Sequence, residues 1–510
     1  MQIGSTFSSH RRADVTRWLA FHLALGLSGT RLAALTFVLV LFFARLGHRD
    51  LYSSHEARAA QNAQRMLDTS DWGLPVLFDG RADMQKPPAY YWMVAALGWL
   101  NGGSVTEWVA RFPAALAGLF CVLLVYGFLR ADGRPTAAMI AALVLATANH
   151  FTGITRTARL DVPLALAVTM SLLAFYRGCV TATPFRWHLL SAVSAGFAVL
   201  LKGPVALALI GPAAVAWLLV ERRYSQARLP WMSALLGPCV VVGVALPWFL
   251  WANAATDGEF LRIFFWHHNV ARFTGSSPLL ASHPWWYYAP RFAFDVLPWT
   301  PVLLSLVVWS VRSGHWRRDP AFRFGSITTV VMVAVLSAAK FKRADYLLPA
   351  FPFVAIALGC AAEAWLNSRT LPRSVRVARF AFGAFLGGAV VGWVIMTCVI
   401  EPAEQAKEEK RRFAEVIRAH APTPTVILQF RMESHLLSYH LGMPVHTFVE
   451  WGELNELLAA PGPHFVVMPP EYVFATGEIV TRRKLVEIVR LEAYTAGKPL
   501  RPLVFLRTAD

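Results

Sequence analysis

The sequence has few charged residues for its length. Only 15% of its 510 residues are Asp, Glu, Lys or Arg, whereas 56% are hydrophobic; soluble domains average roughly 25% charged residues. This deficit excludes an ordinary soluble enzyme and a disordered chain, and the mean hydropathy of +0.45 indicates a polytopic membrane protein. The net charge of +17 does not indicate a nucleic-acid partner, because the basic residues lie between apolar runs rather than along one face.

Cysteine is also scarce. The five cysteines lie within or at the edges of apolar runs, with no Cys-x-x-Cys motif and no Cys/His cluster. A disulfide framework and a zinc–thiolate site are therefore not expected. The chain shows no internal repeat, and its polar carboxy-terminal stretch has no glycine-rich phosphate loop.

Long apolar runs fill the first 400 residues, and they predict about 11 to 13 transmembrane helices. The run Pro88–Leu100 is too short to cross a membrane, so we expect it to be interfacial or re-entrant. Arg11, Arg12 and Arg17 precede the first run and no cleavage site follows it, which predicts a retained first span. The expected spans are Leu32–Leu46, Trp108–Leu129, Ala137–Phe151, Val162–Tyr176, Trp187–Leu201, Val205–Val220, Trp231–Trp251, Phe292–Val311, Ile327–Ala339, Tyr346–Trp365 and Phe380–Ile400.

The arginines assign a side to each loop. With the amino terminus inside, every later inside loop carries at least two arginines, beginning with Arg130 and Arg134, as the positive-inside rule requires. Three features then lie outside: a loop over residues 47–107, a loop over residues 252–291, and residues 401–510. The expected organisation is a transmembrane domain over residues 1–400 and an outer domain over residues 401–510.

The outer carboxy-terminal stretch alternates short β-like runs with helical patterns. It opens with a charged amphipathic helix, Glu404 to Ala419, and a second helical pattern covers Trp451–Ala460. This alternation predicts a small soluble α/β domain. The β-like runs are Thr425–Phe430, Val445–Val449, His464–Met468 and Leu503–Leu506.

Several cations lie on the side where positive charge should be scarce. They are Arg58, Arg81 and Lys86 in the first long loop, Arg156 and Arg159 beside Asp161, and Lys202, Lys340, Lys342 and Arg343 in short outer loops. Snorkelling at span ends explains any one of them, but the group suggests an anionic ligand, most simply a phosphate at the outer interface.

Three outer carboxylates accompany these cations. Asp161 begins a span and is either functional or a helix cap. Asp345 is expected to pair with Lys342 and Arg343, and Glu56 is either functional or a neighbour of Arg58 on a solvated helix. Carboxylates facing cations at a membrane surface suit transfer from a lipid phosphate ester, in which a carboxylate accepts a proton and the cations stabilise the leaving phosphate.

A series of motifs resembles one family of membrane glycosyltransferases, which includes the protein O-mannosyltransferases and the aminoarabinose lipid A transferase. Tyr52–Trp92 resembles the first outer loop of that family, with Ser-Asp-Trp followed by Lys-Pro-Pro and Tyr-Trp. The motifs RTARLDVPL at Arg156–Leu164, FFWHHNVARF at Phe264–Phe273 and KFKRADYLLP at Lys340–Pro349 follow in order.

The resemblance implies a GT-C fold and an inverting transfer from a polyprenyl-phosphate monosaccharide. It maps Lys86 onto the residue that holds the donor phosphate. Arg58, Tyr90, Lys202, Arg272, Lys340 and Tyr346 are the other candidates for binding the donor. It also implies a bacterial inner-membrane protein with an extracytoplasmic active site.

The sequence departs from the family pattern at two positions. The family opens the loop with Asp-Glu, whereas this chain has His55 followed by Glu56, so Glu56, Asp161 and His55, in that order, are the candidate bases. Gln85 stands where the family often has Glu, which weakens a metal site there. The sequence leaves open whether a divalent metal ion binds, and His267 and His268 are weak candidate ligands for it.

The expected function is therefore transfer of a monosaccharide to a hydroxyl or phosphate of a lipid, glycan or protein acceptor. The expected partners are the lipid-linked donor, that acceptor and membrane lipids. Two alternatives remain: a transporter or flippase of lipid-linked sugars, and a catalytically degenerate relative.

Overall fold

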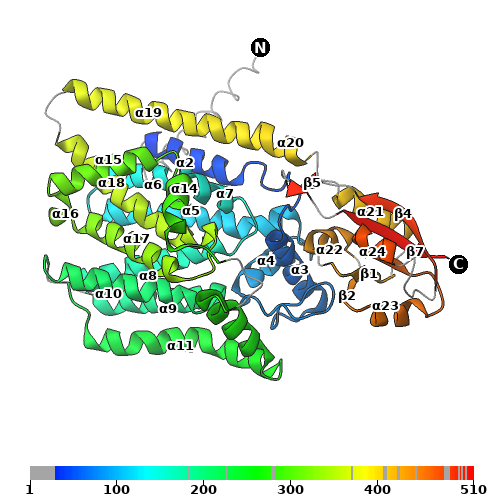
Figure 1. Ribbon diagram of the computed structural model, residues 1–510. Helices are drawn as coiled ribbons and strands as arrows, with labels where there is room; N and C mark the ends of the chain where they lie inside the picture. Colours follow the sequence, from blue (N-terminus) through cyan, green and yellow to red (C-terminus); the bar gives the residue numbers. More distant parts are fainter. Residues whose placement is uncertain are drawn as a thin grey trace, which may run out of the picture.

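A bundle of long helices carries a mixed β-sheet at one end (Figure 1). This computed structural model describes residues 29–509 apart from short gaps. Arg11, Arg12 and Arg17 lie outside the described residues. The gaps are 182, 226, 277–281, 369–371, 406–409, 422–424, 433, 443–444, 476–482, 492–493, 496–497 and 500–501.

Helices account for nearly all of the chain before the sheet. In order they are α2 (Gly29–Phe43), α3 (Ser54–Thr69), α4 (Ala89–Leu100), α5 (Glu107–Ala131), α6 (Pro135–Thr147), α7 (Asn149–Thr155), α8 (Asp161–Val180), α9 (Pro184–Lys202), α10 (Val205–Glu221), α11 (Trp231–Ala254), α12 (Glu259–Leu261), the π-helix η1 (Arg262–Val270), α13 (Ala271–Thr274), η2 (Trp285–Tyr287), α14 (Tyr288–Asp295), α15 (Thr300–Arg312), α16 (His315–Arg318), α17 (Pro320–Ala338), η3 (Ala344–Ala350), α18 (Phe351–Asn367), α19 (Pro372–Ile395), the π-helical η4 (Met396–Ile400) and α20 (Glu401–Gln405).

Among the described residues, seven helices are long and apolar enough to cross a membrane, or nine if each of two bent pairs is one span. The chain bends by 66° between α6 and α7 and by 109° between the Trp285–Asp295 helix and α15. Two shorter apolar helices, α2 and α10, coincide with the remaining expected runs. These helices agree with a helical membrane protein, while the number of spans stays a prediction. Helix α4 has only 12 residues and ends at the exposed Trp99 and Leu100.

Small residues let the central helices approach closely. A Cβ added to Gly325 of α17 would lie 2.6 Å from the carbonyl oxygen of Phe353 in α18. A Cβ added to Gly359 of α18 would lie 2.5 Å from the carbonyl oxygen of Ala137 in α6. Such contacts are the usual means of packing helices in lipid, and they hold α18 at the centre of the bundle.

The carboxy-terminal sheet has the strand order β2-β1-β3-β7-β4. Strands β2, β1 and β3 are parallel, β7 pairs antiparallel with β3, and β4 pairs antiparallel with β7 at the edge of the sheet. All four predicted β-like runs are strands, whereas β4 was not predicted because its exposed and half-buried residues show no clean alternation. The elements are α21 (Lys410–His420), β1 (Ile427–Phe430), α22 (His435–Leu441), β2 (Val445–Phe448), α23 (Trp451–Leu458), β3 (Phe465–Met468), α24 (Pro470–Ala475), β4 (Leu485–Leu491), β5 (Tyr494–Thr495), β6 (Lys498–Pro499) and β7 (Leu503–Thr508).

The sheet end of the molecule packs directly on the first outer loop. Helix α22 lies against α3 (Figure 1), and Gln61 of α3 donates its amide to the carbonyl oxygen of His435 at 2.7 Å. Arg411 of α21 forms ion pairs of 2.9 Å with Asp50 and with Glu107. These contacts support α3, which forms one wall of the site described next.

Candidate active site

Helix α3 separates two neighbouring acid/base candidates, His55 and Glu56. The helix starts at Ser54 because the Ser53 hydroxyl accepts a hydrogen bond from the Glu56 amide at 3.3 Å, a standard N-cap. Successive residues on a helix point in different directions. His55 therefore faces a cavity, whereas Glu56 points into the protein, where its exposure is 0%.

Glu56 is enclosed by donors. Arg111 of α5 donates from Nε to Glu56 Oε1 at 2.8 Å, and the Ala158 amide donates to the same oxygen at 3.0 Å. The Tyr52 amide donates to Oε2 at 3.1 Å. Burial alone would raise the pKa of Glu56, but Arg111 and these hydrogen bonds lower it below its ordinary value. Of the two alternatives for Glu56, the one that makes it a neighbour of Arg58 on a solvated helix is wrong, because the side chain is buried. The carboxylate does not line the cavity.

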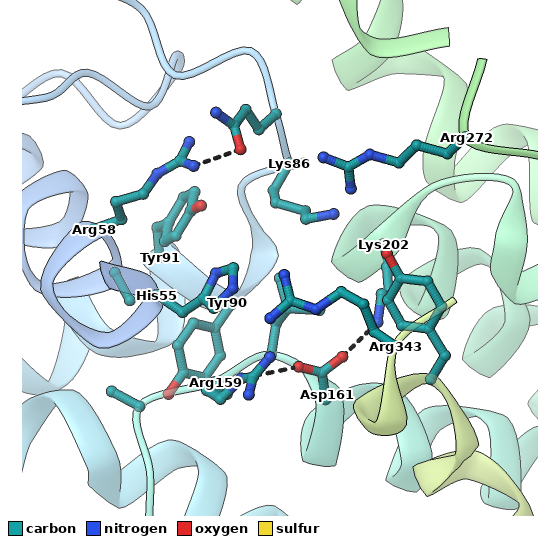
Figure 2. Close-up of a pocket in the computed structure, with 15 residues that line it drawn as sticks. His55, Arg58, Lys86, Tyr90, Tyr91, Arg159, Asp161, Lys202, Arg272 and Arg343 are labelled. Carbon is teal, nitrogen blue, oxygen red and sulfur yellow. Dashed lines mark hydrogen bonds and ion pairs between the residues drawn. The ribbon is translucent and has the colours of Figure 1, made fainter. Parts of the chain in front are cut away.

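The cavity lies between α3, α4, the start of α8 and the end of α9. Its volume is about 150 Å³. Figure 2 shows that charged side chains from several elements converge on it. The lining residues are His55, Arg58, Ala59, Gln85, Lys86, Tyr90, Tyr91, Ala158, Arg159, Leu160, Asp161, Lys202, Arg272, Arg343 and Tyr346.

Asp161 is the carboxylate that lines this cavity among the described residues. It stands in the first turn of α8, where an acidic residue also favours the helix end. Its Oδ1 accepts from Lys202 Nζ at the end of α9, and its Oδ2 lies 3.3 Å from Arg159 Nε (Figure 2). Lys202 also lies 4.2 Å from the ring centre of Tyr346. Asp161 is thus both at a helix end and in the site, as the two expectations for it allowed.

Asp345 lies behind the cavity and forms ion pairs with two arginines that line it. Its carboxylate accepts a hydrogen bond from Arg159 Nη2 and lies 3.3 Å from His150 Nε2 and 3.6 Å from Arg343 Nε. The expected pairing with Lys342 is wrong. Lys342 is buried and donates instead to the carbonyl oxygens of His283 and Ala339.

Arg58 and His55 form the α3 side of the cavity. Arg58 is held by Asp83 and by the side-chain oxygen of Gln85. Burial, with repulsion from Arg159 and Arg343, lowers the pKa of His55 to about 3. The imidazole is therefore neutral at physiological pH.

Lys86 and Arg272 have no carboxylate within ion-pair distance in the part of the chain that the structure describes. Figure 2 shows them reaching toward each other from opposite sides of the cavity. Burial, with repulsion from Lys202 and Arg272, lowers the pKa of Lys86 to about 7. The cations at the other end of the bundle differ, because Arg134 pairs with both Glu363 and Asp319.

An apolar groove opens from the cavity. Its volume is about 400 Å³, and Lys86, Lys202, Arg272 and Tyr346 line both hollows. Its other walls are mainly apolar side chains of α10, the η1–α13 segment and α17, with His268 among them. The two hollows therefore match a ligand with a charged head group, which fits the cavity, and an apolar tail, which fits the adjoining groove.

Most of the predicted binding residues come together here: Arg58, Lys86, Tyr90, Lys202, Arg272 and Tyr346. Lys340 does not, because its side chain is exposed while its backbone pairs with Phe273 and His283. His267 is also exposed. Among the described residues, no three or more His, Cys, Asp or Glu side chains lie close enough together to hold a metal ion.

Arg159 and Arg343 line the cavity as well. Both belong to the predicted group of outer cations, but neither was singled out as a catalytic or donor-binding residue. Arg159 stands two residues before Asp161 in the RTARLDVPL motif, and Arg343 stands two residues before Asp345. That repeated Arg-x-Asp spacing is the signal that would have found both.

Comparison with solved structures identifies the fold as GT-C. The chain superposes on the crystal structure of ArnT from Cupriavidus metallidurans bound to undecaprenyl phosphate with a TM-score of 0.76, covering 96% of this chain and 98% of that one at 20% identity. The archaeal oligosaccharyltransferase AglB from Archaeoglobus fulgidus matches with a TM-score of 0.51, covering 87% of this chain and 69% of that one at 13% identity. These matches show the fold.

Sequence comparison indicates the nearer relatives. Residues 85–251 match the dolichyl-phosphate-mannose-protein mannosyltransferase family. The undecaprenyl phosphate-alpha-4-amino-4-deoxy-L-arabinose arabinosyl transferase of Pseudomonas paraeruginosa is 31% identical over 63% of this chain and 57% of its own length. That of Edwardsiella ictaluri is 32% identical over the same shares. The matched region thus spans less than two thirds of the length of these relatives. The resemblance that the sequence motifs predicted, to mannosyltransferases and aminoarabinose transferases, is confirmed.

Proposed function

We propose that the protein is an inverting glycosyltransferase that uses a polyprenyl-phosphate sugar as its donor. The observation that carries this proposal is the junction of the two hollows at Lys86 and Arg272. Two cations without carboxylate partners among the described residues stand where a charged cavity meets an apolar groove. A phosphodiester between a sugar and a long isoprenoid matches that junction, with its phosphate at the cations and its tail in the groove.

The transfer exchanges one bond for another at the anomeric carbon of the sugar. An acceptor oxygen forms the new bond to that carbon, and the bond from the carbon to the phosphate oxygen breaks. The electron pair leaves with the lipid phosphate, and Lys86 and Arg272 stabilise its charge. If the acceptor is a hydroxyl, its proton passes to a base; an ionised acceptor phosphate needs none.

Asp161 is the residue we assign to the acceptor side. It lines the cavity, whereas Glu56 is enclosed by Arg111. His55 also lines the cavity and stays the second candidate for the base. Arg58, Arg159 and Arg343 surround the same space and favour an acceptor that carries negative charge, such as a phosphate, over a neutral hydroxyl.

The site is proposed to face the outside of a bacterial inner membrane, with residues 401–510 forming a domain on the same side. The distribution of arginines supports this orientation, and the packing of α22 on α3 agrees with it. The relatives named above are transferases, which favours a transferase over a flippase of lipid-linked sugars.

Turnover in detergent tests the proposal. Purified protein, an undecaprenyl-phosphate sugar and an envelope lipid extract should yield free undecaprenyl phosphate. With a hydroxyl acceptor, Asp161→Asn should reduce the rate at least about 100-fold, the scale of a lost acid–base group; with an ionised phosphate acceptor, which needs no base, the loss should be smaller. Asp132→Asn, at an ion pair far from the cavity, is the matched control and should retain the rate. Because detergent leaves no compartments, turnover excludes an obligate transporter. Binding of the donor without turnover would indicate a degenerate relative.

A further inference from the structure

The cavity wall is strongly asymmetric in charge. Six of its described lining residues are basic: Arg58, Lys86, Arg159, Lys202, Arg272 and Arg343. Asp161 is the carboxylate that opposes them in the described part of the wall. The space next to the donor phosphate is therefore a region of positive potential, and any further group placed there feels that field.

The oxygens of Asp161 are already engaged. Oδ1 accepts from Lys202 and Oδ2 lies 3.3 Å from Arg159. The carboxylates behind the wall are engaged as well. Asp83 holds Arg58 and accepts from Asn62 at 2.8 Å, and Asp345 holds Arg159. Recruiting one of these carboxylates to a ligand would release a buried cation from its partner, which is costly.

Two of the neutral side chains in the wall, His55 and Gln85, stand beside these cations. Gln85 turns its oxygen toward Arg58. Neither side chain supplies negative charge, because a carboxamide is neutral and an imidazole is neutral or positive. The wall thus offers hydrogen bonds but no free anion to a sugar.

We propose that the donor sugar of this protein carries no ammonium group and is an uncharged or acidic sugar. A protonated amino sugar would place a cation among six basic residues, and no carboxylate among the described lining residues is free to meet it. The relatives with the highest similarity reported above are named for 4-amino-4-deoxy-L-arabinose, so the proposal separates this chain from them in substrate. The inference rests on the proposed glycosyltransferase function.

The test is a competition between two donors that differ in one group. Undecaprenyl phosphates carrying L-arabinose and 4-amino-4-deoxy-L-arabinose differ by a hydroxyl against an ammonium. We expect kcat/KM to favour the uncharged sugar at least tenfold, which corresponds to about 1.4 kcal/mol. Equal rates, or a preference for the amino sugar, would overturn the inference and leave the proposed function standing. Failure to turn over any polyprenyl-phosphate sugar would overturn both.

Substitutions of the two neutral residues test the cause. His55→Asp and Gln85→Glu each add a carboxylate to the wall and should shift the donor ratio toward the amino sugar. His55→Asn, which adds no charge, should leave the ratio unchanged whatever its effect on the rate. A shift of similar size in His55→Asn would show that shape rather than charge sets the ratio, and would contradict the argument.

Discussion

Replacement of Glu56 distinguishes a structural carboxylate from a catalytic base. Glu56 and Arg111 are both almost fully buried and lie 2.8 Å apart. Removing one partner of a buried ion pair costs about 3–5 kcal/mol, because the other charge stays buried without compensation. Arg111 also holds the carbonyl oxygens of Leu46, Arg49 and Asp50. We therefore expect Glu56→Gln to loosen the start of the first outer loop.

The assay compares thermal unfolding in detergent with turnover per folded molecule. Glu56→Gln should lower the unfolding temperature clearly, while Asp68→Asn on the exposed end of the same helix should not. The stability that Glu56 contributes should be present above the pKa of an unfolded glutamate and lost as pH falls through its lower folded-state pKa. A Glu56→Gln protein that unfolds like the wild type yet has lost turnover would refute this reasoning and make Glu56 the base.

Three further results are expected. The free protein loses the charge of Lys86 as pH rises through about 7, whereas the phosphodiester of an undecaprenyl-phosphate sugar keeps its charge. The affinity for this donor should therefore fall from pH 6 to 8.5. The Lys86→Gln variant should bind the donor weakly, and its affinity should not change over that pH range. Lys86→Ala should mainly weaken donor binding or phosphate departure, and wild-type kinetics would indicate that Lys86 only snorkels. Gly203→Ala should destabilise the protein by about 1–3 kcal/mol in unfolding assays, because φ is +78° and the new Cβ would lie 2.4 Å from the Phe264 ring; Gly211→Ala, with open space around it, is the control.

The residues that could be predicted are those with an intrinsic signal in the chain. Lys86 and Lys202 stand out because cations are scarce on the outer side of a membrane protein, and both line the cavity. Asp161 stands out because it begins an apolar run, and it does begin α8. Arg272 and Tyr346 follow from motifs, since nothing in their immediate surroundings shows that α13 and η3 meet.

The errors concern partners that are distant in the sequence. Glu56 reads locally as a solvated helix residue next to Arg58, but Arg111, 55 positions later, encloses it. Lys340 and Lys342 lie in one short loop, yet the backbone pairing with Phe273 and His283 turns the first outward and the second inward. The bends between α6 and α7 and before α15 were not predicted either, because hydropathy measures length and not direction.

Native mass spectrometry of the protein purified in mild detergent tests the central claim most directly. The junction of the cationic cavity and the apolar groove predicts that the purified protein carries a bound polyprenyl phosphate, with or without a sugar. If it carries none, it should bind added undecaprenyl phosphate but not added undecaprenol. Lys86→Ala with Arg272→Ala should abolish that binding. A wild-type protein that is empty and also ignores added undecaprenyl phosphate would contradict the assignment of the donor.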